Sequence, residues 1–191
     1  MSDYRLVPEP VQAADLLKRA IAGDRAAFEQ ILIVHEKQVL GTALRMTGRM
    51  EDAQDAAQEV FLRLFRNLKK FRTTDELRPW SYRVTINVCH DLRRRNSRQP
   101  SSWPEGLDPS TASPSPESAF DTLQRRLRME IALAGLPEKE RAALVLREIE
   151  GLSTREAAEI LNSSEATVRS QICSARIKLR AAMDRAERRR S

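Results

Sequence analysis

Hydrophobic residues along the chain recur at steps of three and four, the spacing that places side chains on one face of an α-helix. The segment 51–68 is the most regular, because its apolar residues from Ala53 to Leu68 fall on a single face. No long alternating run of β-branched residues indicates a strand. The pattern therefore predicts an all-α protein. The predicted helices span residues 14–22, 25–47, 51–68, 76–96, 120–134 and 137–150.

The stretch 151–180 contains two further helical patterns, separated by the polar residues Asn162–Ser164. Ser153 and Glu156 have the spacing of a capping box at the start of the first pattern. The second begins at about Glu165, and its apolar residues again share one face. Together they predict a helix-turn-helix, whose second helix is suited to a DNA major groove. The hydrogen-bonding and basic residues on the other side of that helix are Thr167, Arg169, Ser170, Gln171, Ser174, Arg176, Lys178 and Arg180.

A change of composition separates the helix-turn-helix from the first four predicted helices. Residues 99–119 hold five prolines among many serines and threonines, a composition that cannot bury a hydrophobic core. We therefore expect a flexible linker here. It joins two small helical domains, at residues 12–98 and 120–185.

Charge and composition narrow the range of functions. The net charge of +6 and the isoelectric point of about 9.8 favour an anionic partner such as nucleic acid. The cysteines and histidines have no metal-ligand spacing, and no nucleophile or phosphate-loop motif is present. We expect no enzymatic activity, no metal and no cofactor. No apolar signal segment or membrane span is evident, so we expect a cytoplasmic protein that does not insert into a membrane.

Two polar features in the first predicted domain each have two interpretations. The helix 51–68 carries acidic residues early and arginines late, which suits the helix dipole but also a protein-docking face; physics alone favours the dipole. Trp80 and Tyr82 border a basic loop and could stack on unpaired bases. For Trp80, a role as a core anchor is the favoured interpretation.

Three segments, in this order, resemble bacterial RNA polymerase sigma factors of the extracytoplasmic-function group. DAQDAAQEVFLRLFRNLKKF is similar to the region that docks on core polymerase. RPWSYRVTINVCHDLRRR is similar to the region that melts and reads the promoter −10 element. The stretch from LPEKERAALV to RIKLR is similar to the domain that reads the −35 element. Three ordered motifs are far more specific than one helix-turn-helix.

This resemblance implies partners and site residues. The partners are core RNA polymerase, through the clamp helices of its largest subunit and the flap of its second-largest subunit, promoter DNA and an anti-sigma factor. The docking residues are Asp52, Asp55, Gln58, Glu59 and Leu62. The −10 residues are Lys69, Phe71, Arg72, Thr73, Asn87, Asp91, Arg94 and Arg95. The −35 residues are Thr167, Arg169, Ser170, Gln171, Ser174, Arg176 and Lys178.

The chain departs from the family pattern on the predicted reading helix. Gln171, Cys173 and Ser174 are smaller or uncharged where relatives often carry arginine or a bulky residue. Two other functions stay open. A dimeric helix-turn-helix repressor would need fixed half-site spacing, which a flexible linker does not favour. A nuclease would need a metal-binding cluster that the sequence does not show.

Overall fold

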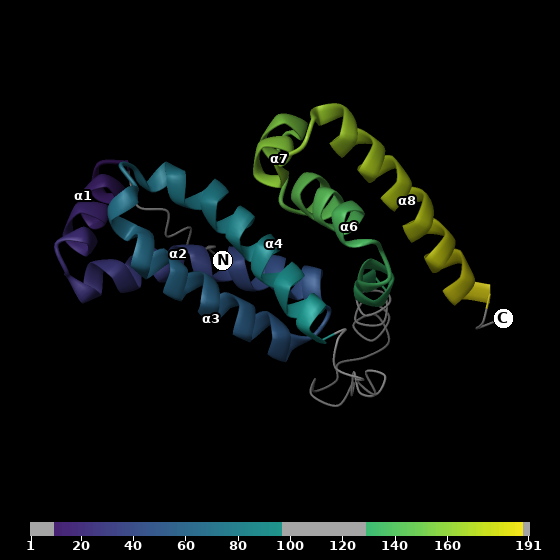
Figure 1. The fold of residues 1–191 in the computed structure, drawn as a ribbon, viewed down its shortest axis with the longest axis horizontal. Helices are drawn as coiled ribbons and strands as arrows, with labels where there is room; N and C mark the ends of the chain where they lie inside the picture. Colours follow the sequence, from purple (N-terminus) through teal and green to yellow (C-terminus); the bar gives the residue numbers. More distant parts are fainter. Residues whose placement is uncertain (1–9, 97–128, 189–191) are drawn as a thin grey trace, which may run out of the picture. The chain divides into compact units, whose positions relative to one another are not determined.

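The computed structural model describes residues 10–96 and 129–188, and every regular element in these two stretches is helical (Figure 1). The all-α prediction is therefore confirmed. The chain forms two compact units. One comprises residues up to 44 together with 49–89, and the other comprises 45–48 together with the residues from 90 onward. The predicted linker lies outside the described residues, so the predicted domain boundaries stay predictions.

The first four predicted helices are all present, with small shifts at their ends. The first helix begins at Pro10, four residues before its predicted start, because a proline needs no hydrogen-bond acceptor in the first turn. Two short 3₁₀ turns occupy the polar loop before the fourth helix. The elements are α1 (Pro10–Ile21), α2 (Arg25–Thr47), α3 (Met50–Asn67), η1 (Leu68–Lys70), η2 (Thr74–Glu76) and α4 (Leu77–Asn96).

The joint between α1 and α2 follows the expected turn chemistry. Gly23 closes α1 with a φ of +99°, a conformation that favours glycine. Asp24 then caps α2, because its carboxylate accepts hydrogen bonds from the backbone N–H groups of Ala26 at 3.0 Å and Ala27 at 3.2 Å.

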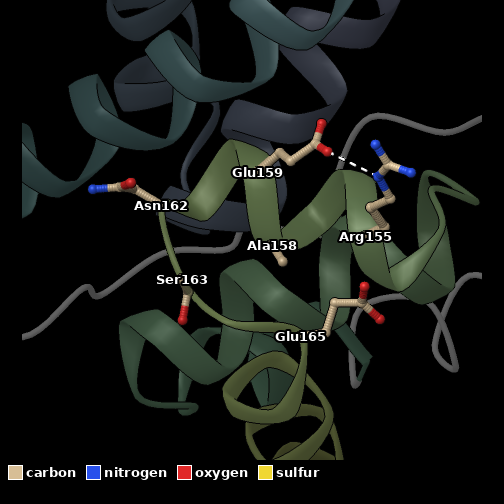
Figure 2. Close-up of a pocket in the computed structure, with 6 residues that line it drawn as sticks. All are labelled: Arg155, Ala158, Glu159, Asn162, Ser163 and Glu165. Atoms are coloured by element: carbon tan, nitrogen blue, oxygen red, sulfur yellow. Dashed lines mark hydrogen bonds and ion pairs between the residues drawn. The ribbon is translucent and has the colours of Figure 1, made fainter.

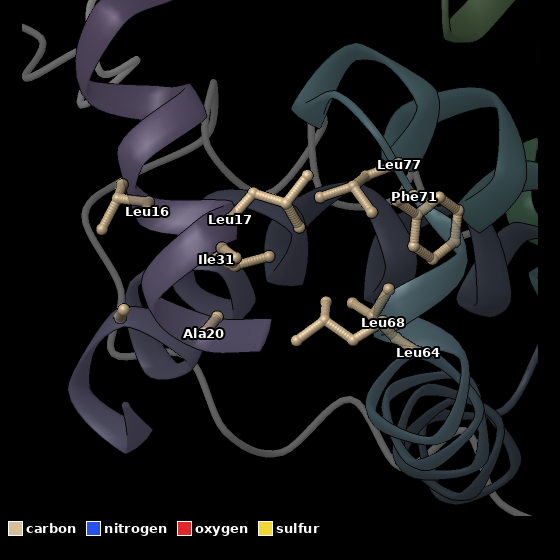
Figure 3. Packing of buried hydrophobic residues seen from close by; sticks show 9 residues of the cluster. Leu16, Leu17, Ala20, Ile31, Leu64, Leu68, Phe71 and Leu77 are labelled. Atoms are coloured by element: carbon tan, nitrogen blue, oxygen red, sulfur yellow. The ribbon is translucent and has the colours of Figure 1, made fainter. Parts of the chain in front are cut away.

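A hydrophobic cluster joins α1, α2, α3 and the start of α4 (Figure 3). Leu17, Leu64 and Leu77 each expose 2% or less of their surface there. Burying a leucine side chain contributes about 1.5–3 kcal/mol. Because the cluster also takes in Leu68 and Phe71, it fixes the position of the loop that precedes α4.

His35 on α2 is buried in the first unit. Burial lowers its pKa from the ordinary 6.5, since a buried imidazole resists protonation. The unfolded chain therefore binds a proton more readily than the folded one. We expect the neutral, buried His35 to contribute its full share to the free energy of unfolding above about pH 6.5. That contribution should be lost as the pH falls through the lowered pKa of His35 in the folded state. His35→Gln should flatten the decline of the unfolding midpoint between pH 7 and 5, measured by circular dichroism. An unchanged decline would contradict this role.

The second unit contains the predicted helix-turn-helix. A helical segment at 129–134 precedes it, and the rest of the helix predicted over 120–134 lies outside the described residues. Pro137 precedes the next helix as its N-cap, with φ −55° and ψ 142°, rather than occupying its first turn as predicted. The further elements are α6 (Glu138–Leu144), the π-helical turn η3 (Val145–Ile149), α7 (Thr154–Leu161) and α8 (Glu165–Arg188).

The π-helical turn was not predicted, because its residues have ordinary helical periodicity. The N–H of Glu150 bonds to the carbonyl of Val145 at 3.0 Å, which widens the last turn by one residue. Gly151 then ends the helix with a φ of +72°, and the N–H of Leu152 reaches back to the carbonyl of Leu146 at 3.1 Å. The helical region thus ends within one residue of the predicted end at residue 150.

Candidate nucleic-acid interface

The corner between α7 and α8 is held by side-chain and backbone caps. The capping box is present, because the N–H of Glu156 bonds to Ser153 Oγ at 3.2 Å and the N–H of Ser153 bonds to Glu156 Oε2 at 2.7 Å. Asn162 ends α7 in the left-handed conformation, with φ 49° and ψ 53°, which asparagine tolerates better than most residues. Ser164 caps α8 by accepting the N–H of Thr167 at 3.1 Å. These contacts fix the angle at which α8 leaves the turn.

The side chains of α8 fall into four stripes, since residues at steps of four, three and four share one helix face. The core stripe consists of Val168, Ile172, Ala175 and Leu179. Its first three members are buried, as the sequence predicted. This stripe faces the rest of the unit, where α6 and α7 pack against α8.

The second stripe, here called the α6-side stripe, consists of Thr167, Gln171, Ser174 and Lys178. Glu140 of α6 accepts hydrogen bonds from Lys178 Nζ at 2.7 Å and from Ser174 Oγ at 3.1 Å. Gln171 is half-buried, and Thr167 Oγ1 lies 2.8 Å from the hydroxyl of Ser164. All four residues were predicted to contact DNA. In the structure three of them form hydrogen bonds to neighbouring groups of the protein, and the fourth, Gln171, is half-buried.

The third stripe, the arginine stripe, carries Arg169, Arg176 and Arg180, all exposed. Arg176 forms a 2.8 Å ion pair with Glu148, and Arg169 a 3.2 Å pair with Glu165. Such exposed pairs contribute little to stability. Phosphates can therefore compete for these arginines at small cost.

The fourth stripe, the outer stripe, consists of Ala166, Ser170, Cys173 and Ile177, and every member is exposed. Ser170 is the one residue of this stripe that was among the predicted −35 contacts. Cys173 and Ile177 were missed as candidate contacts because the prediction considered hydrogen-bonding and charged side chains. The spacing alone could have found them, because they follow Ser170 at steps of three and four.

A shallow open hollow of about 490 Å³ lies beside the corner, lined by α7, the turn and the start of α8 (Figure 2). Arg155 in its lining pairs with Glu159 at 3.1 Å. Glu165, also in the lining, pairs with Arg169 of the arginine stripe. Since its charges are balanced locally, the hollow offers less attraction for a phosphate than the arginine stripe does.

A second candidate surface lies at the loop before α4. Lys69, Arg72 and Thr73 are exposed, as a contact with DNA requires. Phe71 is not, because its ring is 8% exposed and belongs to the hydrophobic cluster. Phe71, which was predicted as a −10 residue, is therefore buried in the structure rather than exposed at the surface of the loop. Its ring packs edge-on against Trp80 at 5.3 Å between centroids, which supports the interpretation of Trp80 as an anchor.

The loop is braced at both ends. The carboxylate of Glu76 accepts the N–H of Arg72 at 3.1 Å across the loop. Tyr82, one of the two aromatics that could have stacked on bases, is 1% exposed and lies under the guanidinium of Arg78 at 5.8 Å from the ring centroid. Base stacking by Tyr82 is therefore excluded in this conformation. The loop offers polar and basic groups on a rigid apolar base.

One face of α4 continues this surface. Asn87, Asp91, Arg94 and Arg95 are all exposed, as predicted. Arg83 is exposed one helical turn before Asn87 on the same face, and the sequence interpretation did not include it. The face therefore combines amide, carboxylate and guanidinium groups over three turns.

The predicted docking residues lie on the face of α3 opposite its buried apolar side. Asp55, Gln58 and Leu62 are exposed, and Asp52 and Glu59 are half-buried. Glu59 pairs with Arg63 at 2.7 Å. Phe65 is a difference from the sequence interpretation, which placed it on the buried side. It is 63% exposed and touches Phe28 edge-on at 5.2 Å between centroids. The face is therefore polar with an apolar margin.

Within the ranges 10–96 and 129–188, no group of three or more histidine, cysteine or carboxylate side chains is arranged to hold a metal ion. No helix in these ranges is long and apolar enough to cross a membrane.

Comparison with known proteins decides the family. The family model for sigma-70 region 2 matches residues 33–99, and that for sigma-70 region 4 matches residues 126–179. The RNA polymerase sigma-H factor of Pseudomonas aeruginosa is 33% identical over 86% of this chain and 90% of its own length. The ECF RNA polymerase sigma factor SigM of Mycobacterium tuberculosis (strain H37Rv) is 34% identical over 87% of this chain and 82% of its own length. The chain belongs to the extracytoplasmic-function (ECF) group of sigma-70 factors.

Two solved structures share the fold of this chain. The structure of CnrH in complex with the cytosolic domain of CnrY matches with a TM-score of 0.64 and 26% identity, over 90% of this chain and 97% of that one. The fold also matches the sigma factor RpoE of Bartonella quintana, solved with the anti-sigma factor NepR, at a TM-score of 0.66 and 19% identity over 82% and 96% of the two chains. The family assignment means that the present chain directs promoter-specific transcription initiation, and the repressor alternative is not supported.

Proposed function

We propose that this sigma factor uses three separate exposed surfaces, each of which binds a different partner. The observation that carries the proposal is that each surface has buried apolar side chains beneath it while its polar side chains face outward. The acidic face of α3 docks on the clamp helices of core RNA polymerase. The loop and α4 bind the −10 element, and α8 binds the −35 element.

The chemistry of each surface suits its proposed partner. The face of α3 combines hydrogen-bond acceptors with an apolar side chain, as a protein interface does. Its residues are Asp52, Asp55, Gln58, Glu59 and Leu62. The loop before α4 and the exposed face of α4 offer hydrogen-bond donors and acceptors for an unpaired DNA strand. The residues that offer them are Lys69, Arg72, Thr73, Asn87, Asp91, Arg94 and Arg95. Phe71 supports that site from below rather than contacting a base. The −35 site draws on Thr167, Arg169, Ser170, Gln171, Ser174, Arg176 and Lys178, with the arginine stripe facing phosphates.

Further partners and the location of the protein follow from the family. Since a structure of a sigma factor with its anti-sigma factor has the same fold, we propose that an anti-sigma factor controls this chain as well. The second unit would contact the flap of the second-largest polymerase subunit. Sigma factors are generally not enzymes, so we propose that this chain acts by binding alone, without metal or cofactor. It would work in the cytoplasm, where the polymerase acts.

Single-residue variants test the assignment of the two DNA surfaces. Holoenzyme made with the wild-type chain should protect an upstream and a downstream promoter segment and make the downstream thymines reactive to permanganate. Arg176→Ala should weaken upstream binding to a similar degree on different upstream sequences, because the arginine stripe faces phosphates, and it should leave the downstream pattern on a strong promoter unchanged. Asn87→Ala with Arg94→Ala should reduce permanganate reactivity and keep the upstream protection. The opposite pairing of variant and effect would refute the assignment.

A further inference from the structure

The outer stripe of α8 is more apolar than the face of a DNA-reading helix needs to be. Ile177 exposes 65% of its surface, and Cys173 is an exposed free thiol. With Ala166 and Ser170 they form a continuous line of short or apolar side chains over more than three turns. The stripes on both sides of this line are polar. An apolar line with polar flanks favours a partner of the same pattern.

Two carboxylates hold the hydrogen-bonding side chains of α8 at its flanks. Glu140, whose side chain is 16% exposed, holds Lys178 and Ser174 on the α6 side. Glu148 holds Arg176 on the opposite flank at 2.8 Å. The side chains best suited to bond with base edges are therefore drawn away from the outer stripe. In a groove, these flanks would lie nearest the phosphate walls, and the outer stripe nearest the bases.

The apolar group that the DNA major groove presents is the C5 methyl of thymine. The arginine stripe beside the outer stripe supplies positive charge for the phosphates that border such a groove. We propose that Cys173 and Ile177 read thymine methyl groups in the −35 element. This inference rests on the assignment of α8 to the −35 element and specifies the chemistry that it reads.

Replacing thymine by uracil removes the methyl group and keeps the base pair, so it isolates the proposed contact. Synthetic promoter duplexes would carry thymine or uracil only upstream of position −30, with the sequence taken from a promoter that the wild-type holoenzyme uses. We expect the wild-type holoenzyme to bind the thymine duplex about three- to tenfold more tightly, since one buried methyl group is worth about fourfold. Equal binding of the two duplexes would overturn the proposal.

Variants connect the thymine preference to the two side chains. In holoenzyme made with Ile177→Ala or Cys173→Ser, the preference for thymine should shrink towards onefold. Ile131→Ala is the matched control, because Ile131 is an exposed isoleucine of the second unit that lies outside α8, and its loss should leave the preference intact. Thermal unfolding followed by circular dichroism should show both α8 variants as stable as the wild type, and a folded variant that keeps the full preference for thymine would also overturn the proposal. A wild-type chain that gives no promoter-specific start sites would instead refute the proposed function itself.

Discussion

Removing the exposed side chains of the α3 face should abolish tight binding to core RNA polymerase. In the variant Asp55→Ala, Gln58→Ala and Leu62→Ala, we expect the dissociation constant to rise at least thirtyfold, about 2 kcal/mol, because a few central residues carry most of an interface's energy. The three side chains are exposed, so their loss should leave the hydrophobic cluster and the folding of α3 intact. Fluorescence anisotropy of the labelled chain with core polymerase measures the change.

The control for this prediction is a variant with the same kind of change elsewhere on the first unit. Glu29→Ala with Gln30→Ala alters two exposed polar residues of α2, and it should bind core polymerase as the wild type does. The α3 variant should also keep its DNA binding through the second unit. Normal polymerase binding, or a loss of DNA binding alone, would show that the face of α3 is an ordinary charged helix surface.

A carboxylate at Val168 should unfold the helix-turn-helix, whereas one at Ser170 should disable it while it stays folded. Val168 is 0% exposed at the centre of the core stripe, so Val168→Asp would bury a charge without a partner. We expect a destabilisation of more than about 4 kcal/mol. Ser170 is exposed on the outer stripe, and Ser170→Asp should change stability by less than about 0.5 kcal/mol.

The two variants should nevertheless share one functional defect. Ser170→Asp places a negative charge next to the DNA, so transcription from a promoter that depends on its −35 element should fall at least tenfold. Thermal unfolding followed by circular dichroism should separate the variants, with the folded second unit lost in Val168→Asp alone. Normal transcription by a folded Ser170→Asp chain would mean that the outer stripe does not face DNA.

The helices and the corner of the second unit were predictable because local interactions determine them. The capping box of Ser153 and Glu156, the cap by Asp24 and the stop at Gly151 all depend on residues within a few positions of one another. The apolar periodicity of 51–68 likewise determines which side of α3 is buried. By contrast, the π-helical turn at Val145–Ile149 leaves no mark in the hydrophobic pattern.

The differences from the sequence interpretation arise where tertiary contacts decide the surroundings of a side chain. Phe71 follows two lysines in a polar loop, yet it folds back onto leucines that are distant in sequence. Phe65 continues the apolar period of α3, but the period does not show how much of its ring other residues cover. In the structure the ring contacts Phe28 and is otherwise largely exposed. Ser174 and Lys178 bond to Glu140, which is 34 and 38 residues away, so no local pattern predicts these contacts.

Run-off transcription with purified core RNA polymerase tests the central claim most directly. Core polymerase would be incubated with a pool of genomic promoter fragments, with and without the purified chain and with no anti-sigma factor present. The account predicts discrete new transcripts that require the chain and whose start sites share an upstream and a downstream sequence element. Core polymerase that neither binds the chain nor gains start sites would contradict the claim that this chain is a working promoter-specificity factor.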